Sequence, residues 1–341
     1  MPDMLRHFGL SLVTGALAFL GLSDSAWAQQ DTLASAQERG YLRCGVNPGQ
    51  LGMSMANASG EWVGMSADLC RAIAAATLGD PNATEFVPVT ARNRFTALRS
   101  GQIDVILRNT TWTFTRDTAE SVQFVGPFFV DEEMVLVSEE SAITDLAMLN
   151  DRTVCVIAGG PSEVIMNDLA IASNAIINIL PVGSAEQYRQ AYLEGRCVGI
   201  ADGQAALRAL QISLPDPDGH RLVGGRLAYS PLSIGTRQGD DHWTDIVRWT
   251  FYVLATAEDL DLTAAEVGRT DTQAWTSQLA RLNSSGASLG LEPGWAIRAI
   301  QAAGNLAEIY DRSFGPESSL PIERGPSALW RQGGMILPPP L

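Results

Sequence analysis

Short apolar runs alternate with amphipathic helical segments along this chain, and that alternation constrains the fold more than any other feature. In the first third of the sequence, three predicted strands are separated by two predicted helices (Leu42–Val46, Ser66–Leu78, Thr84–Pro88, Arg94–Ser100 and Ile103–Leu107). We expect Ser66 to cap the first of these helices. This order of elements builds a largely parallel sheet with helices packed over it.

A second, smaller set of alternating elements follows (Thr153–Ile157, Glu163–Ala172, Ala175–Leu180, Ser184–Glu194, Val198–Ala201 and Gln204–Gln211). Two extended runs, Phe124–Val137 and Leu222–Gly235, are suited to carry the chain between the two sets. The pattern predicts an α/β protein of two lobes, each a mostly parallel sheet flanked by helices, joined by a two-strand hinge with a ligand cleft between the lobes. We expect residues 29–132 and 230–341 to form lobe 1, and residues 133–229 to form lobe 2.

The C-terminal part of lobe 1 is predicted to be a helical extension. Trp243–Ala257 and Pro293–Tyr310 have the spacing of two amphipathic helices. The proline-rich end, Ile336–Leu341, is predicted to be a surface arm.

The N-terminus has the layout of a secretory signal peptide. A basic start at Arg6 and His7 precedes an apolar run, Leu10–Leu22, and the small-x-small sequence Ala26-Trp27-Ala28. We expect cleavage after Ala28, which makes residues 1–28 the signal peptide, and export to the periplasm. No later segment is long and apolar enough to span a bilayer, so no membrane insertion is expected.

The charge distribution argues against a polyanionic partner. The formal net charge is −15, and all 23 basic residues are arginine. These arginines form no basic run, which argues against nucleic acid and against anionic lipid surfaces. The sequence also contains no recognised catalytic, metal-binding or dinucleotide-binding motif, so we expect neither an enzyme nor a bound metal or cofactor.

Four cysteines, Cys44, Cys70, Cys155 and Cys197, are too far apart for a CxxC metal or redox motif. An even number of cysteines in an exported protein favours two disulfides, for which three connectivities exist. We favour Cys44–Cys70 and Cys155–Cys197, because each bridge then stays within one half of the chain. Buried free thiols are the alternative.

The stretch Asp104–Asp117, DVILRNTTWTFTRD, is the strongest candidate for a binding site. An apolar strand ends there in a group of hydrogen-bonding side chains (Arg108, Asn109, Thr111 and Arg116). A guanidinium is a rigid donor fork that matches a carboxylate, and ligands of α/β sheets bind at the carboxyl ends of strands. The alternative is a polar strand end that leads into a helix capped by Thr113 or Thr115.

Two further features make this candidate site complementary to a zwitterion. Asp202 follows the strand Val198–Ala201 and is suited to bind an ammonium group. The helix that starts near Pro161 offers free N–H groups, and Ser162 offers a hydroxyl. In this arrangement Arg116 binds the carboxylate of the ligand.

These segments resemble the periplasmic amino-acid-binding proteins of ABC transporters, in particular the general L-amino-acid-binding subfamily of solute-binding protein family 3. The resemblance covers nearly the whole chain after the signal peptide and is carried by sequences such as LRCGV, GEWVGMSADLCRAIAAATLGDP, RFTALRSGQIDVILRNTTWTFTRDTA, TVCVIAG, RQGDDHWTDIVRW and ALWRQGG. It implies the type II periplasmic-binding-protein fold, an L-amino acid as ligand, ABC transporter permease subunits as partners, and a monomer.

The resemblance also implies roles for individual residues. Arg116 matches the arginine that binds the α-carboxylate of the ligand, Asn109 and Thr111 match supporting contacts, and Asp202 matches the aspartate that binds the α-amino group. The chain departs from the family pattern at Gly159-Gly160-Pro161, where these receptors usually carry Gly-Thr-Thr.

Two other functions fit the same sequence. The first is an exported enzyme on the same scaffold, similar to the cyclohexadienyl dehydratases, with Glu163 or Asp202 as general acid. The second is a receptor that docks to a partner protein without a small ligand. The altered Gly160-Pro161 turn is the feature that suggests it.

Overall fold

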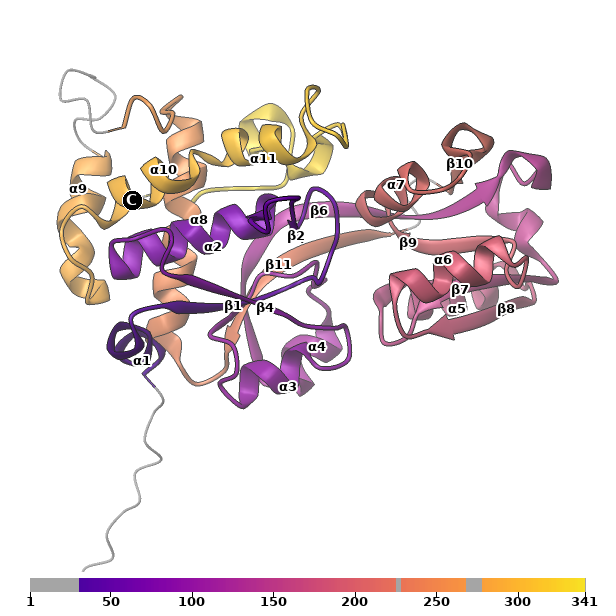
Figure 1. Ribbon diagram of the computed structural model, residues 1–341, viewed down its shortest axis with the longest axis horizontal. Helices are drawn as coiled ribbons and strands as arrows, with labels where there is room; N and C mark the ends of the chain where they lie inside the picture. The colour runs from indigo at the N-terminus through magenta and orange to yellow at the C-terminus, as the bar shows by residue number, and fades with distance from the viewer. Residues whose placement is uncertain (1–30, 225–227, 268–277, 341) are drawn as a thin grey trace, which may run out of the picture.

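The computed structural model describes residues 31–224, 228–267 and 278–340 and has two lobes that lie side by side (Figure 1). The predicted signal peptide lies outside the described residues. Within the part of the chain that is described, no helix combines the length and apolar character needed to cross a membrane.

Lobe 1 is built on the parallel strands β4 (Thr84–Pro88), β1 (Leu42–Val46) and β5 (Val105–Ile106), in that order. Helices cover both faces of this sheet (Figure 1). They are α1 (Thr32–Arg39), α2 (Met65–Leu78), α3 (Arg94–Arg99), α4 (Phe114–Ala119) and α8 (Asp241–Asp259). The strands and helices predicted from the alternating pattern are therefore present in the predicted order.

Lobe 2 contains the parallel strands β9 (Gly199–Gly203), β7 (Arg152–Ile157) and β8 (Ile177–Val182). The flanking helices are α5 (Pro161–Ser173), α6 (Ala185–Leu193) and α7 (Gln204–Ile212). Apolar side chains on the two faces of the sheet form two separate small cores, one with Tyr188 and Leu207 and the other with Val156 and Met166.

Two long strands connect the lobes (Figure 1). The 17-residue strand β6 (Val122–Ser138) pairs with β11 (Tyr229–Arg237) up to Glu132. From Glu133 onward β6 pairs instead with β9 and with β10 (His220–Val223). The strand thus passes from one lobe to the other at the point where its partner changes.

A C-terminal extension packs on lobe 1 and reaches the connecting strands. Its helices α9 (Gln278–Ser284), α10 (Trp295–Ala303) and α11 (Leu306–Phe314) lie on the side of α2 and α8. The Ser327 hydroxyl accepts a hydrogen bond from the Val130 N–H at 2.9 Å and donates one to the Val130 carbonyl at 3.3 Å. Val130 faces Pro231, which has no N–H, so Ser327 contributes a donor that the opposite strand lacks at this point.

Two disulfides each lie within one lobe. Cys44 is bonded to Cys70 with a Cα–Cα distance of 6.3 Å, and Cys155 to Cys197 with 5.7 Å. The first joins strand β1 to helix α2, and the second joins strand β7 to the segment before β9.

Three sequence expectations are wrong in detail. The single helix predicted over Pro293–Tyr310 is two helices, because Gly304 has a φ of 87° and Asn305 starts α11 with a capping box closed by Glu308. The helix α2 begins one residue earlier than expected, with Gly64 rather than Ser66 at the N-cap. The predicted surface arm begins with a buried residue, since Ile336 forms a bridge with Leu329.

Candidate functional site

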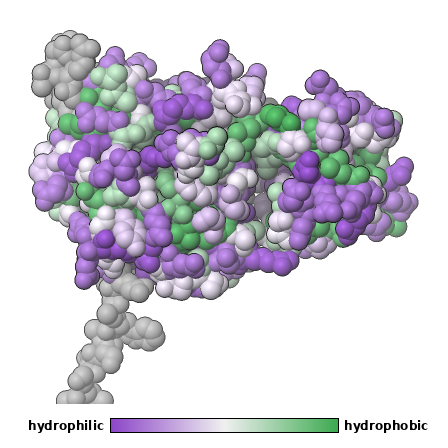
Figure 2. Space-filling view, viewed as in Figure 1, coloured by the Kyte–Doolittle hydropathy of each residue, from purple (hydrophilic) through white to green (hydrophobic). Residues whose placement is uncertain are grey.

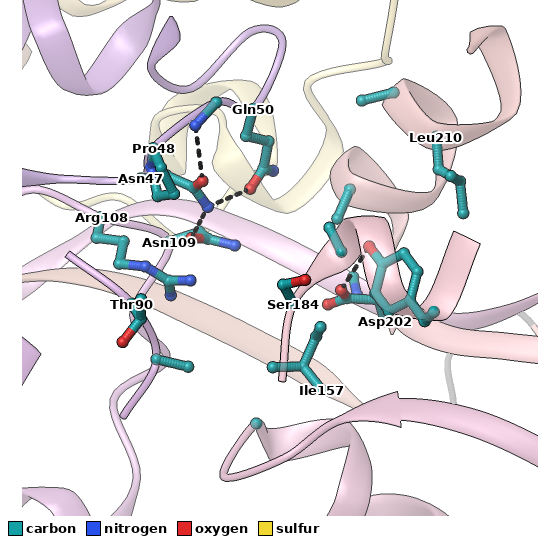
Figure 3. Close-up of a pocket in the computed structure, with 18 of the residues that line it drawn as sticks. Asn47, Pro48, Gln50, Thr90, Arg108, Asn109, Ile157, Ser184, Asp202 and Leu210 are labelled. Carbon is teal, nitrogen blue, oxygen red and sulfur yellow. Dashed lines mark hydrogen bonds between the residues drawn. The ribbon is translucent and has the colours of Figure 1, made fainter. Parts of the chain in front are cut away.

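A cavity of about 680 Å³ lies between the two lobes. The space-filling view shows the molecule hollowed at this position (Figure 2). In the close-up, Asn47, Thr90, Arg108 and Asn109 of lobe 1 face Asp202 and other lobe 2 residues across the cavity (Figure 3). The volume falls within the range of typical small-molecule sites.

The lobe 1 wall is formed by the stretch that follows β5. Arg108, Asn109 and Thr111, three of the predicted ligand-binding residues, all line the cavity. Arg108 donates from Nε to the Val89 carbonyl at 3.1 Å, and the Asn109 side chain accepts a hydrogen bond from Asn47 Nδ2 at 2.9 Å. Burial is the main reason that the pKa of Arg108 falls to about 10, with the charge of Asp202 opposing the change.

Arg116 lies on α4 and is buried, with its guanidinium at the cavity wall. Thr113 caps α4 through its side chain, so the stretch is a capped helix start as well as part of the cavity wall. One terminal nitrogen of Arg116 donates to the Thr111 carbonyl at 2.8 Å, and the other donates across the cleft to the Gly159 carbonyl at 3.1 Å. Burial lowers the pKa of Arg116 to about 10, and the carboxylate of Glu133 opposes this change most strongly.

The opposite wall is acidic. Asp202 near the end of β9 accepts hydrogen bonds from the Tyr188 hydroxyl at 3.3 Å and from the Gly203 N–H at 2.8 Å. Burial, followed by the nearby charge of Glu133, raises the pKa of Asp202 from 3.8 to about 7. A carboxylate in this state gains much from a bound cation, because a cation restores its charged form.

Two further carboxylates from the connecting strand β6 line the same cavity. Glu133 is held by the hydroxyls of Ser162 at 2.7 Å and Ser230 at 2.5 Å. Asp131 accepts hydrogen bonds from backbone N–H groups, including that of Ala205 at 3.3 Å. Burial raises the pKa of both carboxyl groups, for Asp131 well above its usual value.

Two residues that the sequence placed near the ligand are engaged elsewhere. Ser162 is buried and bonded to Glu133, and it is not among the residues that line the cavity. Glu163 accepts a hydrogen bond from the Gly159 N–H at 2.9 Å, as a carboxylate in the first turn of α5. Neither side chain is therefore placed to contact a ligand directly.

The sequence reading missed several residues of the cavity wall. They are Asn47, Gln50, Arg94, Asp131, Glu133, Tyr188 and Ser184. The sequence gives a usable signal only for Asp131 and Glu133, since the three acidic residues of GPFFVDEE are unusual in an apolar strand.

The arrangement suits a small molecule that carries both charges. Guanidinium groups on one wall provide forked donors for carboxylates, and buried carboxylates on the other wall accept hydrogen bonds from an ammonium group. Among the described residues, no group of three or more histidine, cysteine, aspartate or glutamate side chains is arranged to hold a metal ion.

Comparison with known proteins identifies relatives over almost the whole chain. The family described as bacterial extracellular solute-binding proteins, family 3, matches residues 42–316. The chain is 36% identical to the general L-amino acid-binding periplasmic protein AapJ of Rhizobium johnstonii, over 97% of this chain and 98% of that protein. It is 33% identical to the glutamate/glutamine/aspartate/asparagine-binding protein BztA of Rhodobacter capsulatus, over 96% and 97% of the two chains.

A solved structure gives the same result for the fold. The structure of an ABC transporter periplasmic binding protein from Brucella ovis with glutathione bound is 36% identical in sequence, with a TM-score of 0.86. The match covers 91% of this chain and 99% of the Brucella ovis chain. The architecture is therefore the type II periplasmic-binding-protein fold, and the family is one of binding proteins rather than enzymes.

Proposed function

Because the chain belongs to the bacterial extracellular solute-binding proteins of family 3, we propose that it is an exported receptor that captures an L-amino acid between its lobes. In this proposal Arg116 binds the α-carboxylate of the ligand and Asp202 binds its α-ammonium group. Asn109, Thr111 and Arg108 support the carboxylate from the same wall. The names of AapJ and BztA, both of which describe amino-acid binding, support this ligand class.

The observation that carries the proposal is the opposition of charges across one cavity. The guanidinium groups of Arg108 and Arg116 come from lobe 1, and the carboxylates of Asp202 and Glu133 come from lobe 2 and from β6. Among the described residues, the one lobe 2 arginine on the lining, Arg189, is paired with Glu186 of the same helix at 3.5 Å. A zwitterion between them makes attractive contacts with both sides, so binding stabilises the closed arrangement of the lobes. The change of partner in β6 between Glu132 and Glu133 supports lobe boundaries at 132/133 and near 230, with the hinge there.

The Gly159-Gly160-Pro161 turn offers a ligand fewer hydrogen-bond donors than the Gly-Thr-Thr turn of related receptors. Gly160 and Pro161 replace the two threonine hydroxyls, and Arg116 donates across the cleft to the Gly159 carbonyl. Since a carbonyl cannot donate to a ligand carboxylate, the carboxylate depends more on Arg116 than it would with the hydroxyls present.

Export, delivery and assembly complete the proposal. Residues 1–28 act as a cleaved signal peptide, the mature chain works in the periplasm as a monomer, and the loaded receptor docks to the permease of an ABC transporter. A short peptide is a second candidate ligand, because the cavity has room for more than one residue and the Brucella ovis relative holds glutathione.

The test is the identity of the ligand that co-purifies. Freshly purified mature protein is denatured, and the released compounds are identified by mass spectrometry. The emptied protein is then refolded and titrated by calorimetry with the twenty L-amino acids and with glutathione. We expect an α-amino acid or a short peptide to be released and to bind again, whereas the absence of heat with every compound would reject the proposal.

A further inference from the structure

The turn that joins β7 to α5 in lobe 2, Ala158–Pro161, uses its N–H groups within its own lobe. The Ala158 N–H donates to a carbonyl of β8 at 2.8 Å, and the Gly160 N–H donates to a carbonyl of β7 at 2.9 Å. The Gly159 N–H donates to the carboxylate of Glu163 at 2.9 Å, and Pro161 has no N–H. None of these four residues therefore has an N–H free to donate across the cleft.

The same bonds direct the Gly159 carbonyl outward. In a planar trans peptide the C=O points opposite to the N–H, so the bond of the Gly160 N–H into lobe 2 turns the Gly159 carbonyl away from that lobe. Gly159 has a φ of 73°, a conformation that glycine adopts readily. Glu163 holds the peptide group on the other side of the Gly159 Cα. The orientation of the carbonyl is thus fixed from both sides.

Glu163 is well placed for this task. It is the third residue of α5, a position from which a glutamate usually accepts a hydrogen bond from the N-cap N–H. Here the N-cap is Gly160, whose N–H is already bonded to the Ile157 carbonyl. The carboxylate of Glu163 binds the N–H of the preceding residue, Gly159, instead.

A threonine does not fit this form of the turn. A Cβ atom on Gly160 would lie 2.8 Å from the carbonyl oxygen of Ile157, which is closer than a normal contact. The turn would have to shift to accept it. The glycines that replace the usual hydroxyl-bearing sequence are therefore what allows the Gly159 carbonyl to face lobe 1.

The Gly159 carbonyl forms a direct bond between the lobes. It accepts a hydrogen bond at 3.1 Å from one terminal nitrogen of Arg116, whose other terminal nitrogen donates to the Thr111 carbonyl of its own lobe. Arg116 lies on α4, so this bond joins the lobes away from the connecting strands β6 and β11. Only 8% of the surface of Arg116 is exposed, and a charged donor that is shielded from water makes a strong hydrogen bond.

We propose that the Ala158–Pro161 turn is a latch, which holds the lobes closed by its hydrogen bond with Arg116, and that Glu163 is the residue that positions it. This inference rests on the proposed function, because a latch has a role only in a receptor whose lobes open and close. Part of the stability of the closed state then comes from the protein itself, and the ligand-free receptor populates that state. A guanidinium has five N–H donors, so Arg116 can bind a ligand carboxylate at the same time.

The experiment measures the distance between the lobes in the emptied protein. All four cysteines are in disulfides, so spin labels attach only to the introduced residues of Gln102→Cys in lobe 1 and Asn178→Cys in lobe 2, both at exposed positions. Pulsed electron paramagnetic resonance gives the fractions of closed and open protein. We expect both distances in the emptied wild-type protein and the shorter distance alone after addition of the amino acid that co-purifies.

Variants of Glu163 test its positioning role. We expect Glu163→Ala to lower the ratio of closed to open protein by about three- to tenfold, the range for one hydrogen bond. Glu163→Gln keeps an acceptor oxygen for the Gly159 N–H and should keep the ratio, although it removes the charge from the first turn of α5. Asp168→Ala, which removes an exposed carboxylate of the same helix, is the matched control and should also keep it. The affinity of each variant for the amino acid should fall in proportion to its closed fraction.

The outcomes separate the latch from the receptor. Emptied wild-type protein with only the open distance would overturn the latch, and so would a Glu163→Ala variant with the wild-type ratio. If the amino acid still closes the lobes in these cases, the proposed function stands. Distances that no amino acid changes, in a protein that binds none, would overturn the proposed function together with the latch. If Glu163→Ala does not fold, Glu163→Asp replaces it, because the shorter side chain does not reach the Gly159 N–H.

Discussion

The half-buried carboxylate of Asp202 leads to an unusual prediction, in which a substitution at the binding site stabilises the protein. Its pKa is raised from 3.8 to about 7 in the folded, ligand-free chain. Between about pH 4 and pH 7, the folded state therefore holds a proton that the unfolded state has lost. The stability that the protonated form contributes is fully present below about pH 4 and is lost as the pH rises through about 7.

The magnitude follows from the size of this change. A pKa raised by about three units lowers the free energy of unfolding by about 4 kcal/mol at pH 8 and by less than about 2 kcal/mol at pH 5. Asp202→Asn keeps a neutral acceptor for the Tyr188 hydroxyl and the Gly203 N–H. We expect the variant to be more stable than the wild type by up to about 4 kcal/mol at pH 8, which moves the urea midpoint by about 1 M.

The assay is urea unfolding of the ligand-free protein, followed by far-ultraviolet circular dichroism at pH 8 and pH 5. Asp168→Asn, an exposed substitution on α5, serves as the control and should leave both midpoints unchanged. If Asp202→Asn were less stable than the wild type at pH 8, or if the difference were the same at both pH values, the reasoning would be refuted.

Three further predictions concern pH, the hinge and the disulfides. Amino-acid affinity should fall by about tenfold or more from pH 7.5 to pH 5.5, because Asp202 must lose its proton to pair with an ammonium group. Calorimetry at both pH values measures this, and a constant affinity would contradict it. Ser327→Ala should cost about 1–3 kcal/mol in urea unfolding, because it leaves the Val130 N–H without its side-chain partner, and an unchanged midpoint would argue against that contact. Replacing Cys155 and Cys197, which are bonded and 42 residues apart, by serine should cost about 2–5 kcal/mol. A double variant with the wild-type urea midpoint would speak against it.

Much of the fold could be predicted because its elements have local causes. Strand β1 lies over Leu42–Val46 as expected, and the runs that became β6 and β11 were identified as crossings between the lobes. The break between α10 and α11 was missed because Gly304 and Asn305 interrupt an apolar stripe that continues on both sides. The periodicity of apolar residues identifies the stripe, whereas the end of one helix and the start of the next depend on the capping residue Asn305.

The candidate site could be predicted only where one stretch of sequence carries several polar groups. Arg108, Asn109, Thr111 and Arg116 were found because they follow a single strand, and all of them line the cavity. Arg94 was missed because nothing in its sequence neighbourhood distinguishes it from a surface arginine at a helix start. Only the tertiary structure shows that it is buried at the cavity wall, with no hydrogen-bond partner for its Nε among the described residues.

Ser162 is a predicted site residue whose side chain lies away from the cavity. The sequence placed its hydroxyl in the ligand site, because it follows the turn at Pro161 where a receptor hydroxyl was expected. In the folded chain the Ser162 hydroxyl donates a hydrogen bond to Glu133, which is 29 residues away in sequence. A contact of this kind between β6 and α5 depends on how the lobe packs and not on a local pattern.

The central claim is that Arg116 binds the α-carboxylate of an amino acid, and calorimetry on Arg116→Met tests it most directly. Arg331→Met is the matched control, since that arginine is exposed and pairs with Asp259 outside the cavity. For the amino acid identified by mass spectrometry, we predict that Arg116→Met lowers the affinity at least about tenfold, with the control unchanged. An Arg116→Met protein that folds normally and binds the same amino acid with wild-type affinity would contradict the claim.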